Sequence, residues 1–347
     1  MKWLATFSLT LILCLQAFTQ SSSDLRIANK YAYSGQCTNA IEMYETFESK
    51  LSLQNYYTTF LKCLLEEKKY TEAISLVKKA RKKYPNQITY IFDLGLVYKK
   101  KGDKYRADKE FKKSLDNLRA GRTNDVNTLA AKFSKNGESE WLYKVYEKGQ
   151  ELNPNYEFGF QQASSLANLG QTEKMIDVYL DLIEKKANNL NTVKIKLQNS
   201  LGRTKSSKDN YDLLRKKLLL RAQKTNNSEL TELLVWLYIQ SNEYDAAYIY
   251  TKALDKRLKE DGSRMFDLAY VAYENKAYQS AIKCYQYIIN LGSENTYYKD
   301  AKISELIVAG EALVETDYST EELLELDKNY QSVISELGET RDMVYLM

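Results

Sequence analysis

A dense run of charged side chains that could do chemistry lies between residues 255 and 264, with the sequence DKRLKEDGSR. A calcium loop of the EF-hand type needs oxygen ligands at regularly spaced positions, and KEDG offers too few. We therefore interpret the run as the solvated side of a helix, on which Asp255 and Lys259 form an i,i+4 pair. The buried side of this helix is then expected to be a stripe of residues four apart: Ala246, Tyr250, Leu254 and Leu258.

The composition excludes several kinds of active site. The 347 residues contain no histidine, which rules out a Ser-His-Asp triad, a Cys-His dyad and any His-ligated metal. The basic segment GRTKSS at 202–207 lacks the second glycine of a phosphate-binding P-loop. Adjacent carboxylates, such as Glu321 and Glu322, point about 100° apart on a helix and cannot share a proton. The sequence therefore predicts no enzyme, no catalytic residue, no metal and no cofactor.

The N-terminus has the features of an export signal. Lys2 precedes an apolar run from Leu4 to Leu15, which is shorter than a comfortable membrane span. Ala17 and Thr19 are small residues at the −3 and −1 positions of a cut before Gln20. We expect residues 1–19 to be a cleaved signal peptide and the chain to reach the periplasm or cell envelope. An uncleaved membrane anchor is the alternative.

The cysteines leave their pairing open. The four are Cys14, Cys37, Cys63 and Cys284, and none forms a C-x-x-C pair. If Cys14 is removed with the signal, three remain in an oxidising compartment, so at least one is free or pairs between chains. Cys37 and Cys63 could form a disulfide, or each could be a small buried apolar residue on a helix.

Charge is distributed unevenly along the chain. The net charge of +4 is too small to indicate nucleic-acid binding. Residues 62–122 contain eighteen Lys and Arg against eight Asp and Glu, whereas residues 301–347 contain three against eleven. These charges are interpreted as solvated helix faces, with binding of acidic and basic partners at the two ends as the alternative.

Small residues recur at an interval of 34. Ala73 and Ala107 are 34 apart, as are Ala247 and Ala281. Another small residue lies twelve positions before three such alanines, namely Ala28 before Ala40, Gly95 before Ala107 and Ala269 before Ala281. A period of this length is typical of stacked helix pairs, in which small residues allow helices to cross closely. The two prolines, Pro85 and Pro154, both fall between one repeat and the next, where a helix must end.

The pattern resembles the tetratricopeptide repeat, most closely in Leu94-Gly95, Tyr98, Ala107 and Phe111. A longer segment, LLVWLYIQSNEYDAAYIYTKALDKRLKEDGSRMFDLA, is similar to exported Bacteroidota repeat proteins of unknown function. The resemblance implies an all-α fold, an α-solenoid in which antiparallel helix pairs form a right-handed superhelix. About eight pairs are expected in residues 21–295, starting near Ser21, Gln54, Ile88, Thr123, Tyr156, Leu190, Ser228 and Gly262. A further helical pair is expected in residues 296–347, in a chain truncated at its C-terminus.

The same resemblance implies that the first helix of each pair lines a groove. In the seventh and eighth copies, several charged and aromatic side chains take the groove positions. The candidate partner-binding residues are Trp236, Phe266, Tyr270, Tyr273, Glu229 and Glu232. Packing of these rings against adjoining helices is the alternative. Some related repeats clamp a peptide's terminal carboxylate, but Asp93 takes one of the matching positions and would repel it.

We therefore expect a non-enzymatic scaffold or peptide-binding protein of the bacterial cell envelope. Its partner would be a protein or peptide, with no nucleic acid, no small-molecule substrate, and contact with a membrane only through export or an uncleaved N-terminal anchor. The alternative is the interaction module of a longer enzyme or regulator whose active part lies beyond residue 347.

Overall fold

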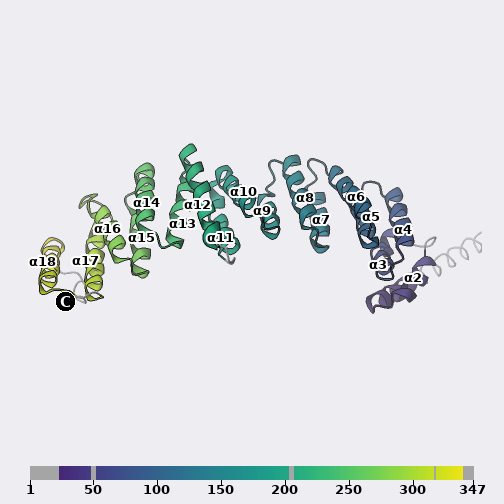
Figure 1. Cartoon of the computed structure of the whole chain (residues 1–347), viewed down its shortest axis with the longest axis horizontal. Helices are drawn as coiled ribbons and strands as arrows, with labels where there is room; N and C mark the ends of the chain where they lie inside the picture. Colours follow the sequence, from purple (N-terminus) through teal and green to yellow (C-terminus); the bar gives the residue numbers. More distant parts are fainter. Residues whose placement is uncertain (1–22, 48–51, 203–206, 316–317, 339–347) are drawn as a thin grey trace, which may run out of the picture. The chain divides into compact units, whose positions relative to one another are not determined.

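The chain is all-α, as the sequence predicts. The computed structural model describes residues 23–47, 52–202, 207–315 and 318–338, and within these ranges every regular element is a helix and no strand occurs. Residues 1–169 and 170–347 form two compact units, which we describe separately. Figure 1 shows that consecutive helices within each unit lie side by side in chain order.

The first unit begins with a helix over residues 23–33. Neighbouring helices pack on one another, and their apolar sides form one continuous core of buried residues from Ala28 to Phe158. The helices are α2 (Cys37–Glu45), α3 (Leu53–Glu66), α4 (Tyr70–Lys83), α5 (Ile88–Lys101), α6 (Lys104–Asp116), α7 (Thr123–Lys135), α8 (Ser139–Leu152) and α9 (Gly159–Asn168).

The second unit continues the alternation of first and second helices and ends in a pair of long helices, α17 and α18. Its elements are α10 (Thr172–Lys185), the short η1 (Ala187–Asn189), α11 (Leu190–Leu201), α12 (Ser207–Lys224), α13 (Ser228–Gln240), α14 (Tyr244–Leu258), α15 (Ser263–Glu274), α16 (Tyr278–Ile289), α17 (Tyr298–Val314) and α18 (Thr320–Leu337). The lengthened turn expected in the sixth copy includes residues 203–206, which lie outside the described residues. The predicted fifth copy is divided, because α9 ends the first unit and α10 begins the second.

Close helix crossings explain the recurring small residues. A Cβ added at Gly95 on α5 would lie 2.5 Å from the Phe111 ring on α6, so only glycine fits at that crossing. The alanines of the repeat pattern are likewise buried: Ala28, Ala40, Ala73, Ala107, Ala247, Ala269 and Ala281. The small residues thus lie where the sequence pattern predicts, in the contacts between helices.

The turn inside several of the described helix pairs uses one left-handed residue. Lys68, Gly102, Asn242 and Lys276 occupy this position with φ between 57° and 89°. In each case the next residue donates its backbone N–H to the carbonyl five positions earlier, which closes the first helix with a Schellman motif. The interval between equivalent turns is again 34, from residue 68 to 102 and from 242 to 276. The repeat is therefore a property of the backbone as well as of the side chains.

The helix α14 corrects two expectations for the charged run. Its buried residues are Tyr244, Ala247, Thr251, Leu254 and Asp255, whereas Leu258 is exposed. Asp255 is not solvated, because its carboxylate accepts hydrogen bonds from the backbone N–H of Gly262 and from the Tyr287 hydroxyl. The predicted i,i+4 pair does not form either, since Lys259 ends the helix in a left-handed conformation. The buried face of α14 is therefore rotated from the expected stripe. It includes the Asp255 carboxylate because Tyr287 of the next helix pair donates a hydrogen bond to it.

The expected signal peptide, residues 1–19 with a cut before Gln20, lies outside the described residues. Among the described helices, none combines the length and apolar character needed to cross a membrane.

Candidate functional site

A pocket in the second unit surrounds the predicted anchor Trp236. Three successive first helices, α11, α13 and α15, contribute most of its lining, and α14 contributes Thr251 and Leu254. Its volume is about 200 Å³, enough for one large side chain of a partner. Trp236 and Ile239 on α13 and Val271 on α15 form apolar walls, and Trp236 is only half-buried. The structure therefore offers an aromatic surface in a hollow, which is a common setting for an anchor of protein recognition.

Glu232 fixes the geometry of this Trp236 pocket. One carboxylate oxygen accepts a hydrogen bond from Lys194 on α11 at 3.0 Å, and the other from Arg264 on α15 at 2.8 Å. Burial by itself would raise the pKa of Glu232, but the hydrogen bonds and charges of Lys194 and Arg264 outweigh it and lower the pKa. One carboxylate thus ties three consecutive first helices together beside Trp236.

The pocket also contains a polar group without a partner. The Oγ1 atom of Thr251 is buried and has no hydrogen-bond partner among the described residues. An unpaired buried hydroxyl costs free energy, about 1–3 kcal/mol. Thr251 lines the Trp236 pocket, but its Oγ1 has almost no exposed surface, so a ligand would reach it only if the pocket rearranged.

The remaining predicted site residues lie elsewhere. Phe266 is half-buried and packs against Tyr285 and Tyr297, with ring centroids 5.4 and 5.7 Å away. Tyr270 is 55% exposed and does not line the pocket. Tyr273 donates a hydrogen bond to Glu311 on α17 at 2.7 Å. Glu229 lies in the first turn of α13, where a negative charge suits the helix dipole. Of the six candidates, the structure brings Trp236 and Glu232 together in this pocket.

A second pocket lies on the first helices of the first unit. It has a volume of about 450 Å³ and is lined by α3, α5 and the C-terminal end of α7. Its floor holds Asp93, which is 2% exposed. Asp93 accepts a hydrogen bond from Tyr57 at 2.9 Å and one from Lys132 at 3.0 Å. This arrangement matches that of Glu232, since a carboxylate on the middle helix again binds both flanking first helices.

The electrostatics of this second pocket differ from the sequence expectation. Burial raises the pKa of Asp93, while the charge of Lys132 opposes that rise. Burial also raises the pKa of Tyr57, as does the nearby Asp93 carboxylate, so this tyrosine remains a hydrogen-bond donor. The expected repulsion of a partner's carboxylate is therefore offset by Lys132. The charged side chains that line the pocket are Lys62, Glu66, Asp93, Lys100, Lys132 and Lys135, which leaves an excess of two positive charges.

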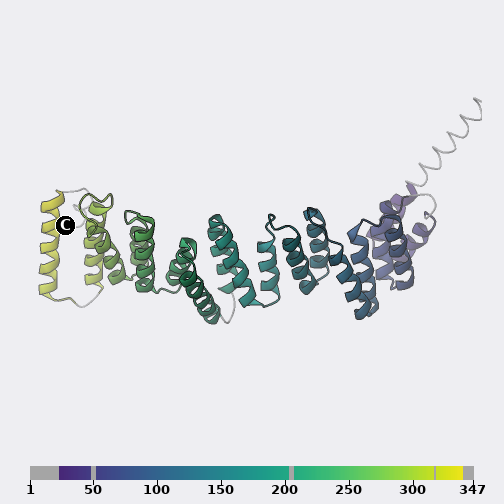
Figure 2. The same cartoon turned by 90° about the horizontal axis from the view of Figure 1, so that it is seen from above.

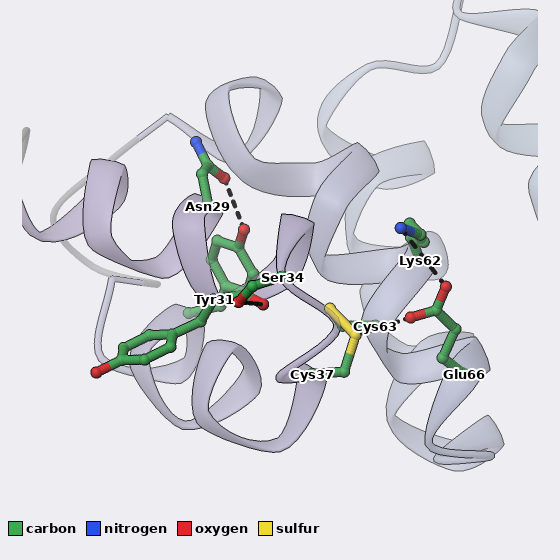
Figure 3. The surroundings of a disulfide bond; sticks show 8 residues. Asn29, Tyr31, Ser34, Cys37, Lys62, Cys63 and Glu66 are labelled. Carbon is green, nitrogen blue, oxygen red and sulfur yellow. Dashed lines mark hydrogen bonds and ion pairs between the residues drawn. A yellow bond between two sulfur atoms is a disulfide. The ribbon is translucent and has the colours of Figure 1, made fainter.

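The N-terminal pair contains a disulfide between Cys37 and Cys63 (Figure 3). Cys37 opens α2 and Cys63 lies near the end of α3, so the bond joins two neighbouring helices. Glu66 approaches the same sulfurs, and the three side chains could form a metal site only with both thiols reduced. The disulfide occupies the ligand atoms that a metal would need. The remaining described cysteine, Cys284, is free and buried, and its burial raises the pKa of its thiol to about 12.

Comparison with known proteins identifies no close relative. No protein-family model matches the chain, and no curated protein matches it. Among solved structures, a thermophilic TPR protein of Thermus thermophilus is 14% identical, with a TM-score of 0.30 over 52% of this chain and 98% of that one. The C-terminal part of a TPR protein from Cytophaga hutchinsonii is also 14% identical, with a TM-score of 0.27 over 82% and 97%. Yeast Tom70 is 12% identical, with a TM-score of 0.26 over 91% and 85%.

With identities of 12–14% and TM-scores of 0.26–0.30, these similarities indicate neither a partner nor an activity. The fold is established by the chain itself, through the helix lengths, the buried small residues and the left-handed turns that recur every 34 residues. Each unit is therefore a stack of helix pairs of the tetratricopeptide-repeat type.

Proposed function

We propose that the chain is a non-enzymatic interaction scaffold that holds a peptide or a partner helix on its first helices. One observation carries this proposal: the Trp236 pocket presents an accessible aromatic wall on three first helices that Glu232 ties together. A large apolar side chain of a partner would fill the pocket against Trp236, Ile239 and Val271. The chain's lack of histidine and of phosphate-binding motifs supports a binding role over catalysis.

The expected energetics follow from preorganisation. Glu232 is already held by Lys194 and Arg264, so the three helices that line the Trp236 pocket need little ordering when a partner binds. An aromatic anchor in such a position commonly contributes ≥ 2 kcal/mol to binding, roughly a 30-fold change in affinity. The positively charged pocket around Asp93 would favour acidic side chains of the same or another partner.

We further propose that the protein works in the periplasm or cell envelope. The apolar N-terminal run with its small residues at positions 17 and 19 motivates this location. The Cys37–Cys63 disulfide supports it, because disulfides persist in oxidising compartments and are rare in the cytosol. Detection of the mature protein in periplasmic or membrane fractions, with an N-terminus at Gln20, would test the location and the cut together.

A displayed library of random peptides, panned against the mature chain, tests the binding proposal. We expect a consensus with one large side chain, whose affinity falls roughly 30-fold in Trp236→Ala. Tyr105→Ala is the matched control, because Tyr105 is a fully solvated aromatic, 79% exposed, on α6 of the other unit. Helical circular dichroism of both variants must match the unmodified chain. A consensus that binds Trp236→Ala as tightly as the unmodified protein would refute the role of this pocket.

A further inference from the structure

A large cleft lies near the acidic end of the chain and shares no lining residue with the Trp236 pocket. It has a volume of about 800 Å³. Its lining comes from Tyr278 at the start of α16, the C-terminal half of α17 and the N-terminal half of α18. Figure 2 shows α17 and α18 side by side. They pack on each other through Leu306 and Val333, and Leu326 and Tyr330 belong both to this packing and to the lining of the cleft.

The cleft is lined by large apolar side chains that are not covered. Val314 is 75% exposed and Leu324 is 57% exposed, and Leu323 and Tyr318 beside them are about half exposed. Scattered exposed apolar residues are normal, but a group of them around one hollow usually indicates a binding surface. The walls are firm, because the Tyr330 hydroxyl donates a hydrogen bond to the Leu306 carbonyl at 3.2 Å and so holds α18 against α17.

The charged residues that line this cleft are all acidic: Glu311, Glu315 and Asp327. Glu315 is held at the α16 side by Lys276 at 2.6 Å and by the Tyr278 hydroxyl. Glu311 is held by the neutral Tyr273, and Asp327 makes no ion pair among the described residues. Only one of the three carboxylates is thus balanced by a cation. These three carboxylates are among the eleven acidic residues of the segment 301–347, which contains only three basic residues.

We propose that this cleft is a docking site for an amphipathic helix whose apolar face is flanked by Lys or Arg. The apolar walls would take the hydrophobic anchors, and the acidic rim would select the basic flanks. The dimensions agree. The lining of α17 runs from Ile307 to Val314, and seven residues of helix rise about 10.5 Å. A docked helix with anchors at i, i+3, i+4 and i+7 covers the same length.

A synthetic helix is the probe for this site. We would label a peptide of roughly four turns, with Leu at the four anchor positions and Lys on both flanks, and measure fluorescence anisotropy at physiological salt. We expect saturable binding to the full mature chain, and at least about tenfold weaker binding to Leu324→Lys and to Val314→Lys. Ile249→Lys is the matched control, because Ile249 is 63% exposed on α14 of the same unit but lines no part of the cleft. It should bind like the unmodified chain.

Each other outcome would overturn the proposal. Equal binding of a peptide with Glu in place of the flanking Lys would show that the acidic rim selects nothing. Equal binding to Leu324→Lys and the unmodified chain, with helical circular dichroism unchanged, would place the peptide elsewhere. A stable dimer in light scattering that Leu324→Lys abolishes would make the occupant a second copy. Trp236→Ala should leave this peptide's affinity unchanged, so the site is tested independently of the proposed function.

Discussion

Reduction of the Cys37–Cys63 disulfide should loosen the N-terminal helix pairs and leave the second unit unaffected. The bond closes a loop with a sequence separation of 26. Loop-closure entropy for a loop of this length gives a stabilisation of about 3.5 kcal/mol at 25 °C. Both cysteines are buried, so the reduced thiols should keep their packing and the comparison should isolate the cross-link. In a stack of helix pairs, a loss of stability in one pair affects mainly that pair and its neighbours.

A hydrogen bond to Glu66 should offset part of the stability that is lost when the disulfide is reduced. Its Oε2 lies 2.9 Å from the Cys37 sulfur, which has no proton to donate while it is part of the disulfide (Figure 3). Reduction provides that proton, and the new hydrogen bond should return ~1 kcal/mol. The net cost of reduction is then ~2.5 kcal/mol, or roughly 60-fold faster amide exchange. In Glu66→Ala the full cost should appear, roughly 300-fold.

Hydrogen exchange read by mass spectrometry measures both effects, with oxidised and reduced samples of each protein. Faster exchange should be confined to the helices that the bond joins, α2 and α3, and to the helix before them. Cys284→Ala is the control for the reductant, because Cys284 is a free buried thiol of the second unit. Equal exchange over residues 37–66 in oxidised and reduced protein would refute the reasoning. A smaller difference in Glu66→Ala than in the unmodified chain would refute the part assigned to Glu66.

Three further predictions concern stability. Lys68 and Gly102 occupy the same left-handed turn position, so Lys68→Gly should stabilise the chain by about 1 kcal/mol and Gly102→Lys should destabilise it by a similar amount, as measured by urea unfolding. Gly95→Ala should lower stability by about 1–3 kcal/mol, and Phe111→Leu in the same chain should recover part of the loss, because the added Cβ meets the Phe111 ring. The folded-state pKa of Glu232 is lowered, so its contribution to stability is present at neutral pH and lost as the pH falls below the ordinary range of Glu, about 4.3. Glu232→Gln should therefore weaken the loss of melting temperature in acid, and an unchanged acid profile would contradict the assigned ion pairs.

The helical architecture could be predicted because its signals are local. Gly95, Ala107 and Phe111 lie within one helix pair, and a side chain at Gly95 would collide with the Phe111 ring unless that ring moved. Such a constraint repeats at a fixed interval, so one well-matched copy indicates the register of the others. Trp236 could be proposed as an anchor for the same reason, since its position in the repeat determines the side of the helix on which it lies.

The polar contacts could not be predicted from helix periodicity, because a polar residue on an amphipathic helix is ordinarily assigned to solvent. Asp255 and Asp93 are instead 2% exposed, and their partners lie on other helix pairs. Asp93 was expected to repel a partner's carboxylate, and the expectation left out Lys132, which lies 39 positions later. Similarly, Phe266 was assigned to the groove by its position in the repeat, whereas its ring packs against Tyr297 of the following pair.

The polar contacts that helix periodicity does not predict join residues about one repeat apart in the sequence. The partners of the buried or half-buried carboxylates are separated from them by 36 and 39 positions at Asp93, 38 and 32 at Glu232, and 32 at Asp255. Buried ion pairs add little net stability, because desolvation offsets their attraction, but leaving one partner unmatched is costly. A neighbouring pair that slipped by one helical turn would leave each carboxylate buried without its donor. These contacts therefore favour the observed register between neighbouring helix pairs over a slipped one.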